Sequence, residues 1–86
     1  MQTLAKAIIQ ALAFLELSDD DIVNPGAAER ATEVIGNTLS DCSDEEREAL
    51  EKVLKQERRA LKAAGAAADL LEFYDTFMEN FGLDED

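Results

Sequence analysis

The chain has 86 residues, and its 47% hydrophobic and 33% charged side chains are typical of a folded globular protein, so we expect one domain over residues 1–86. Twenty acidic residues oppose eight basic ones, and the net charge of −12 argues against nucleic acid or an anionic membrane surface as a ligand. The chain has no histidine, so it lacks Ser–His and Cys–His nucleophile pairs, and we expect no enzymatic activity, cofactor or metal.

Residues 3–17 are predicted to form the first helix. Its expected core face consists of Leu4, Ile8, Ala11, Leu12 and Leu15, with Ile9 at the edge. Phe14 and Leu17 project away from this face, where they either cap a small core from the side or form a self-association patch. The sequence therefore leaves a monomer and a homodimer open.

The same segment is a poor match to a signal peptide, because Gln10 interrupts its apolar run and Glu16 follows it. No apolar run approaches the roughly 20 residues that a membrane span needs. Cys42 is the only cysteine, so the chain cannot form an internal disulfide and nothing demands an oxidising compartment. We expect a cytoplasmic location without a membrane partner.

A second helix is expected over residues 25–41, because Asn24 is a good N-cap and Pro25 suits the first helical position. The acidic stretch at 19–21 before it does not fit a calcium-binding loop and is expected to form a turn or a short helical start. Cys42 is expected to be buried and unreactive. The expected core face contains Ala27, Ala28, Ala31, Val34, Ile35, Thr38, Leu39 and Cys42.

A third helix is predicted over residues 44–64, opened by a capping box of Ser43 and Glu46. Its expected core face contains Ala49, Leu50, Val53, Leu54, Ala60, Leu61 and Ala64. Glu57 falls in the middle of that face, where an unpaired carboxylate would be costly to bury. We consider two explanations: partial exposure at an edge, with Arg30 or the Tyr74 hydroxyl as partner, or an interfacial carboxylate that receives a cation from a second chain.

The fourth helix, over residues 66–81, is expected to be separated from the third by a break at Gly65. Without that break, the apolar stripe of the fourth helix would be rotated by roughly 100° or more from that of the third. The alternative is one long helix that exchanges its end with a second chain. The apolar stripe contains Leu70, Phe73, Tyr74, Phe77, Met78 and Phe81, and residues 84–86 are read as an acidic tail.

The opposite side of the fourth helix is acidic, because residues 63–86 contain seven acidic residues and no basic one. Asp69, Glu72, Asp75 and Glu79 either form an ordinary solvated face or bind a basic partner protein. Together with Glu57, these four carboxylates are the candidate partner-binding residues.

These elements predict an all-α fold, a small antiparallel bundle of four helices. For the function, we expect a non-catalytic protein–protein interaction or structural module. The alternative is an inhibitor or immunity-type protein that blocks a basic active site or a nucleic-acid-binding surface of its partner.

Overall fold

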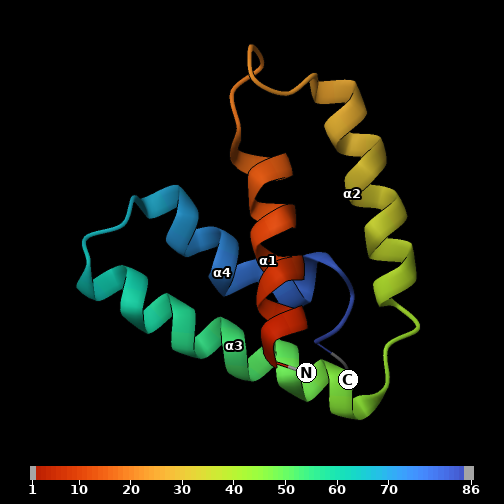
Figure 1. Cartoon of the computed structure of the whole chain (residues 1–86), viewed down its shortest axis with the longest axis vertical. Coiled ribbons are helices and arrows are strands. Elements are labelled where there is room, and N and C mark those ends of the chain that lie inside the picture. Colours follow the sequence, from red (N-terminus) through yellow and green to blue (C-terminus); the bar gives the residue numbers. More distant parts are fainter. Residues whose placement is uncertain (1, 85–86) are drawn as a thin grey trace.

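A computed structural model describes residues 2–84, which contain four α-helices and no strand. The helices are α1 (Gln2–Leu17), α2 (Pro25–Leu39), α3 (Asp44–Ala63) and α4 (Ala68–Asn80) (Figure 1). The predicted all-α bundle is confirmed. Residues 85 and 86 of the predicted acidic tail lie outside the described part of the chain.

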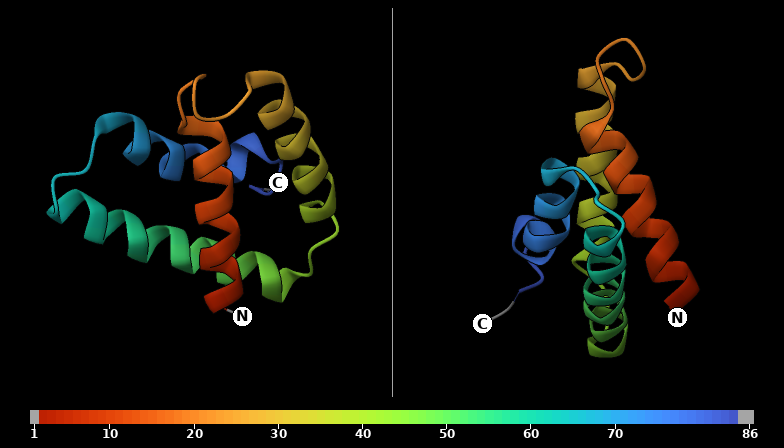
Figure 2. Two further views of the ribbon diagram at one scale, coloured as in Figure 1. Left: turned by 45° about the horizontal axis from the view of Figure 1, so that its top comes forward. Right: turned by 90° about the vertical axis from the view of Figure 1, so that its left-hand side faces the viewer.

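The helices form two antiparallel hairpins, α1–α2 and α3–α4. The left view of Figure 2 shows α1 crossing the α3–α4 hairpin rather than running alongside it. Helix α1 packs against all three other helices, whereas α2 packs against no helix except α1. The first helix is therefore the element that joins the two hairpins.

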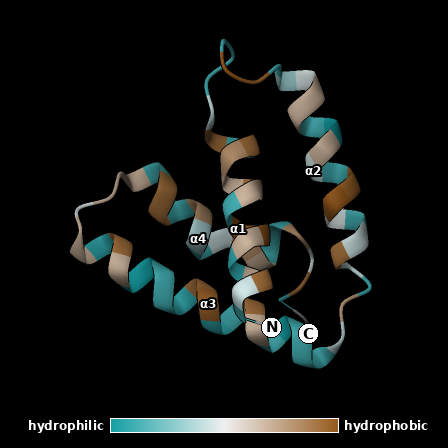
Figure 3. Cartoon of the chain, in the orientation of Figure 1, coloured by the Kyte–Doolittle hydropathy of each residue, from teal (hydrophilic) through white to brown (hydrophobic). Residues whose placement is uncertain are grey.

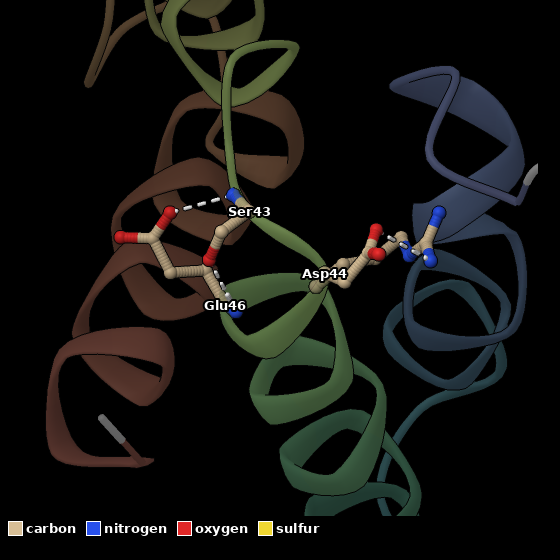
Figure 4. A network of polar contacts seen from close by, with 4 residues as sticks. Ser43, Asp44 and Glu46 are labelled. Atoms are coloured by element: carbon tan, nitrogen blue, oxygen red, sulfur yellow. Dashed lines mark hydrogen bonds and ion pairs between the residues drawn. The ribbon is translucent and has the colours of Figure 1, made fainter.

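The predicted N-terminal caps are present at α2 and α3. The Asn24 side chain accepts a hydrogen bond of 2.9 Å from the backbone N–H of Ala27. At α3 the Ser43 hydroxyl accepts from the Glu46 N–H at 3.1 Å, and the Glu46 carboxylate accepts from the Ser43 N–H at 2.8 Å (Figure 4). These side chains satisfy backbone donors that the first turn leaves without partners.

Glycines in the left-handed conformation end α3 and α4. Gly65 has a φ of 80° and Gly82 a φ of 68°. After Gly65, the N–H of Ala66 donates to the Leu61 carbonyl at 2.9 Å, and after Gly82 the N–H of Leu83 donates to the Met78 carbonyl at 2.7 Å. This is the Schellman pattern, and it separates α3 from α4 as the sequence predicted. In this structure α3 and α4 are two separate helices rather than one continuous helix.

The core lies where α1 crosses the α3–α4 hairpin. Phe77, Ile9 and Leu12 are its largest fully buried side chains, and no charged or polar residue among those described is buried. Phe77 stacks edge-on against Phe73, with ring centroids 5.7 Å apart. The buried cluster consists of Ala5, Ile9, Leu12, Leu39, Leu50, Val53, Leu54, Phe73, Tyr74, Phe77 and Leu83.

The predicted core face of α1 is rotated from the observed one. Leu4 and Ala11, assigned to the core, are exposed, whereas Ile9, placed at the edge, is fully buried, and Ala5 is buried beside it. The observed face points at the α3–α4 hairpin, whereas Leu4 lies at the edge of a hollow that the end of α2 and the start of α3 also line. Apolar side chains occupy more of the circumference of α1 than the packing of the other helices buries.

The predicted faces of α2 and α3 are also too wide, and α2 ends at Leu39, two residues earlier than position 41. Cys42 is half-buried rather than buried. Since α2 has one helical neighbour, only the side toward α1 and the end of α4 is covered. The residues assigned to the core but found exposed are Ala27, Val34 and Thr38 in α2 and Ala60 and Ala64 in and after α3.

Candidate functional site

An apolar stripe runs along the solvent side of α1. It consists of Leu4, Ala7, Ala11 and Phe14, all exposed, with Leu4 68% and Phe14 56% accessible. Ala7 and Ala11 each lie two positions from the fully buried Ile9, a rotation of about 200°, so they project away from the core. Helix α1 is also the most hydrophobic of the four helices (Figure 3).

A second stripe follows the solvent side of α2. Gly36 faces the ring of Phe81, since a Cβ at position 36 would lie 3.1 Å from its Cδ1 atom. Val34 and Thr38, two positions from Gly36, therefore project to the opposite side, and Val34 is 64% exposed. Ala27 is exposed and Ala31 half-buried on the same side.

Each stripe lies on the side of its helix that faces away from the core, and Leu4 and Thr38 from the two stripes line a hollow among α1, the end of α2 and the start of α3. We call the two stripes together the outer face: Leu4, Ala7, Ala11 and Phe14 of α1 with Ala27, Ala31, Val34 and Thr38 of α2. The hollow measures about 350 Å³ and is mainly apolar. Its lining is Leu4, Ala5, Ile8, Thr38, Leu39, Asp41, Cys42, Glu46, Ala49 and Leu50.

Among the residues that line the hollow, the charged groups are two carboxylates, Asp41 and Glu46. Glu46 caps α3, and its carboxylate lies on the side of the turn that faces α1 (Figure 4). A hollow with a mostly apolar lining and a few polar groups is typical of a surface that binds a side chain of a partner.

Of the two side chains predicted for self-association, Phe14 belongs to the outer face. Leu17 is 37% exposed and lies almost one turn further along α1, at the edge of that face. Leu4 and Val34 are exposed although the sequence analysis assigned both to the core. Their apolar character assigned them to the core, and periodicity alone does not show which apolar side chains remain in solvent.

The acidic side of α4 is exposed as predicted, but one of its four carboxylates is already paired. Asp69, Glu72, Asp75 and Glu79 all lie in solvent. Asp75 receives a hydrogen bond of 3.1 Å from Nη2 of Arg58 in α3, and the Arg58 Nε contacts its second oxygen. This bidentate pair ties α3 to α4 and removes Asp75 from the free acidic face.

Glu57 is half-buried at an edge, and its cationic neighbour belongs to the same chain. Its carboxylate lies 3.5 Å from Nζ of Lys6 in α1, and the Glu57 side chain is 30% exposed. Burial and the charge of Glu57 together raise the pKa of Tyr74 above 10.0. The position is thus a contact among α1, α3 and α4, with Lys6 rather than Arg30 as the partner.

The structure also has a basic surface on α3, which the sequence analysis did not predict. Lys55, Arg58, Arg59 and Lys62 line a hollow of about 490 Å³ beside Ala63. Their spacing places them on one side of a helix, and that spacing was the available signal. It was overlooked because acids elsewhere in α3 balance these bases.

Within residues 2–84, no three His, Cys, Asp or Glu side chains are arranged to hold a metal ion. No helix in that range combines the length and the apolar character needed to cross a membrane. Comparison of the chain with family models, curated proteins and solved structures gave no match.

Proposed function

We propose that this chain is a non-catalytic protein–protein interaction module whose partner binds the outer face. The observation that carries the proposal is the exposure of three large apolar side chains of the α1–α2 hairpin, Leu4, Phe14 and Val34. Contiguous apolar surface on a small soluble domain is characteristic of an interaction site.

The stability of the isolated fold does not explain these side chains. Lys, Glu and Gln are good helix formers and would serve at an exposed helical position, whereas Leu4 and Phe14 leave apolar area in water. A partner that covers the outer face would remove this area from water.

Site-specific photo-crosslinking in living cells tests the proposal. A photoreactive residue at position 14 should form a covalent adduct with a protein, and the adduct should be lost when Leu4→Asp is added. The control is position 22, where Ile22 is 64% exposed in the loop between α1 and α2, outside the outer face. Equal adducts at positions 14 and 22, or none at position 14, would contradict the proposal.

The acidic side of α4 supports a second candidate, an inhibitor or immunity-type role toward a basic partner. Asp69, Glu72 and Glu79 remain exposed, and none of them takes part in the Arg58 pair. Replacing these three by Lys should abolish such a complex, mainly through a slower association rate, and added salt should weaken it. Binding that persists in the triple variant would rule out this candidate.

A further inference from the structure

We propose that the partner of the outer face is a second copy of this chain, with the two α1 helices packed antiparallel about a two-fold axis. The inference rests on the proposed function and names the occupant of the same surface. Each copy would insert Phe14 beside Leu4 of the other.

The spacing of the stripe on α1 is self-complementary. Leu4, Ala7, Ala11 and Phe14 follow one another at intervals of three, four and three residues, the same in either direction. An antiparallel pair centred at position 9 therefore places Ala7 against Ala11 and Leu4 against Phe14, as a two-fold interface requires. The alanines at the centre let the helix axes approach to about 8 Å.

The hollow beside Leu4 favours the antiparallel arrangement. Leu4 belongs both to the stripe and to the lining of the 350 Å³ hollow. In the antiparallel pair, Phe14 of the second copy arrives at Leu4 and fills this hollow. In a parallel pair, Phe14 would meet Phe14 and both hollows would stay open, which loses packing contacts.

Electrostatic repulsion between two copies is smaller through α1 than through the more acidic surfaces of the chain. The chain carries a net charge of −12, but α1 contains only Lys6 and Glu16 as charged residues, and Lys6 is paired with Glu57. Two copies repel each other less through α1 than through the acidic side of α4.

The size of the face is sufficient for a dimer of moderate affinity. A hairpin of two helices, about 24 Å long and about 20 Å wide, offers on the order of 500 Å² per copy. The total of about 1,000 Å² reaches the lower limit for a specific interface.

Light scattering and sedimentation across a concentration series provide the first test. The unaltered chain should form dimers, and Phe14→Asp should raise the dissociation constant about tenfold or more, because the aromatic anchor at each end of the helix pair is lost. Ile22→Asp is the matched control, because it places the same charge at an equally exposed apolar position off the outer face and should change the constant less than about twofold. Circular dichroism checks that both variants are folded.

Disulfide trapping tests the geometry in a Cys42→Ser background. Mixing Ala7→Cys protein with Ala11→Cys protein should give a mixed disulfide faster than either protein alone, because antiparallel packing brings only unlike positions within bridging distance. Ala60→Cys, exposed on α3, is the control that should not crosslink. Faster self-crosslinking of each single variant would overturn the antiparallel arrangement.

The outcomes separate this inference from the proposed function. A chain that stays monomeric, or a dimer unaffected by Phe14→Asp, overturns the self-association proposal. If position 14 then still crosslinks to another protein in cells, the outer face remains an interaction site for a different partner. If position 14 gives no adduct at all, both proposals fail.

Discussion

Glu57 lies where α1, α3 and α4 meet, and its surroundings explain how a carboxylate is tolerated on an otherwise apolar face. The side chain keeps 30% of its surface in solvent, and Lys6 provides a cation at 3.5 Å. Because both partners are partly hydrated, we expect the pair to contribute at most about 1 kcal/mol. Its clearest effect is on Tyr74, whose pKa rises through burial and through the negative charge of Glu57.

The first prediction concerns that phenol. The chain has one tyrosine and no tryptophan, so phenolate absorbance reports Tyr74 alone. Glu57→Gln removes the repulsion and should lower the pKa of Tyr74, while burial still keeps it above 10.0. Glu51→Gln, on an exposed residue of the same helix, is the control. An unchanged pKa of Tyr74 in Glu57→Gln would show that the charge of Glu57 does not act on the phenol.

The raised pKa of Tyr74 also fixes the direction of a stability change with pH. Because burial and the charge of Glu57 raise the pKa of Tyr74 in the folded chain, the unfolded chain releases this proton at a lower pH than the folded chain does. The free energy of unfolding should therefore fall as pH rises above about 10, toward the folded-state pKa. Chemical denaturation of Tyr74→Phe between pH 9 and about 11 should show a smaller fall.

Among the elements, the ends of the helices were easier to predict than their buried faces. The caps at Asn24 and Ser43 and the break at Gly65 depend on a few neighbouring residues, and the structure contains all three. The buried faces of α1 and α2 depend on which helices pack against them. Leu4 and Val34 have the composition of core residues, yet the crossing of α1 over the α3–α4 hairpin leaves both in solvent.

Among the candidate site residues, exposure could be predicted from the sequence, whereas the ion pairs could not. The acidic side of α4 follows from its spacing alone and is exposed as expected. The Arg58–Asp75 pair and the Lys6–Glu57 pair join residues that are distant in sequence, and only the packing of the helices reveals them.

The second prediction concerns the end of α3. Gly65 has a positive φ, and a Cβ added at this position would have no neighbouring atom within 4 Å, so the conformation rather than crowding determines the effect of a substitution. Gly65→Ala should lower the free energy of unfolding by about 1–2 kcal/mol, because an L-residue is strained in the left-handed region. Denaturant titration measures the change.

Gly65→Asn is the matched variant for this position, since asparagine visits the left-handed conformation more readily than alanine. We expect it to be less destabilising than Gly65→Ala. If Gly65→Ala instead stabilises the chain and raises its helix content, α3 and α4 do not need the break, and the expectation is wrong.

For the whole molecule, the dominant feature is the imbalance between 20 acidic and eight basic residues. Six of the eight bases lie in α3, so the repulsion among carboxylates is least compensated in the rest of the chain. Self-repulsion of this kind destabilises a compact state and opposes the approach of a second copy.

The third prediction follows from screening. Raising the salt concentration from about 0.02 M to about 0.5 M should increase the free energy of unfolding and strengthen the dimer, because the Debye length falls well below the size of the domain. Denaturation and sedimentation at several salt concentrations measure both. A triple variant with Asp69→Asn, Glu72→Gln and Glu79→Gln should respond less. A dimer that weakens with salt would show that ion pairs, not the apolar outer face, hold it together.

The crossing of α1 over the α3–α4 hairpin has a consequence for biosynthesis. The ribosome makes α1 first, but the side chains that bury Ile9 and Leu12 belong mainly to α3 and α4, which emerge last. Contacts between segments so far apart in sequence require a long loop to close before they form. Until α3 and α4 have been made, the most hydrophobic helix therefore has only α2 to pack against, and at this stage the nascent chain would be most dependent on a chaperone.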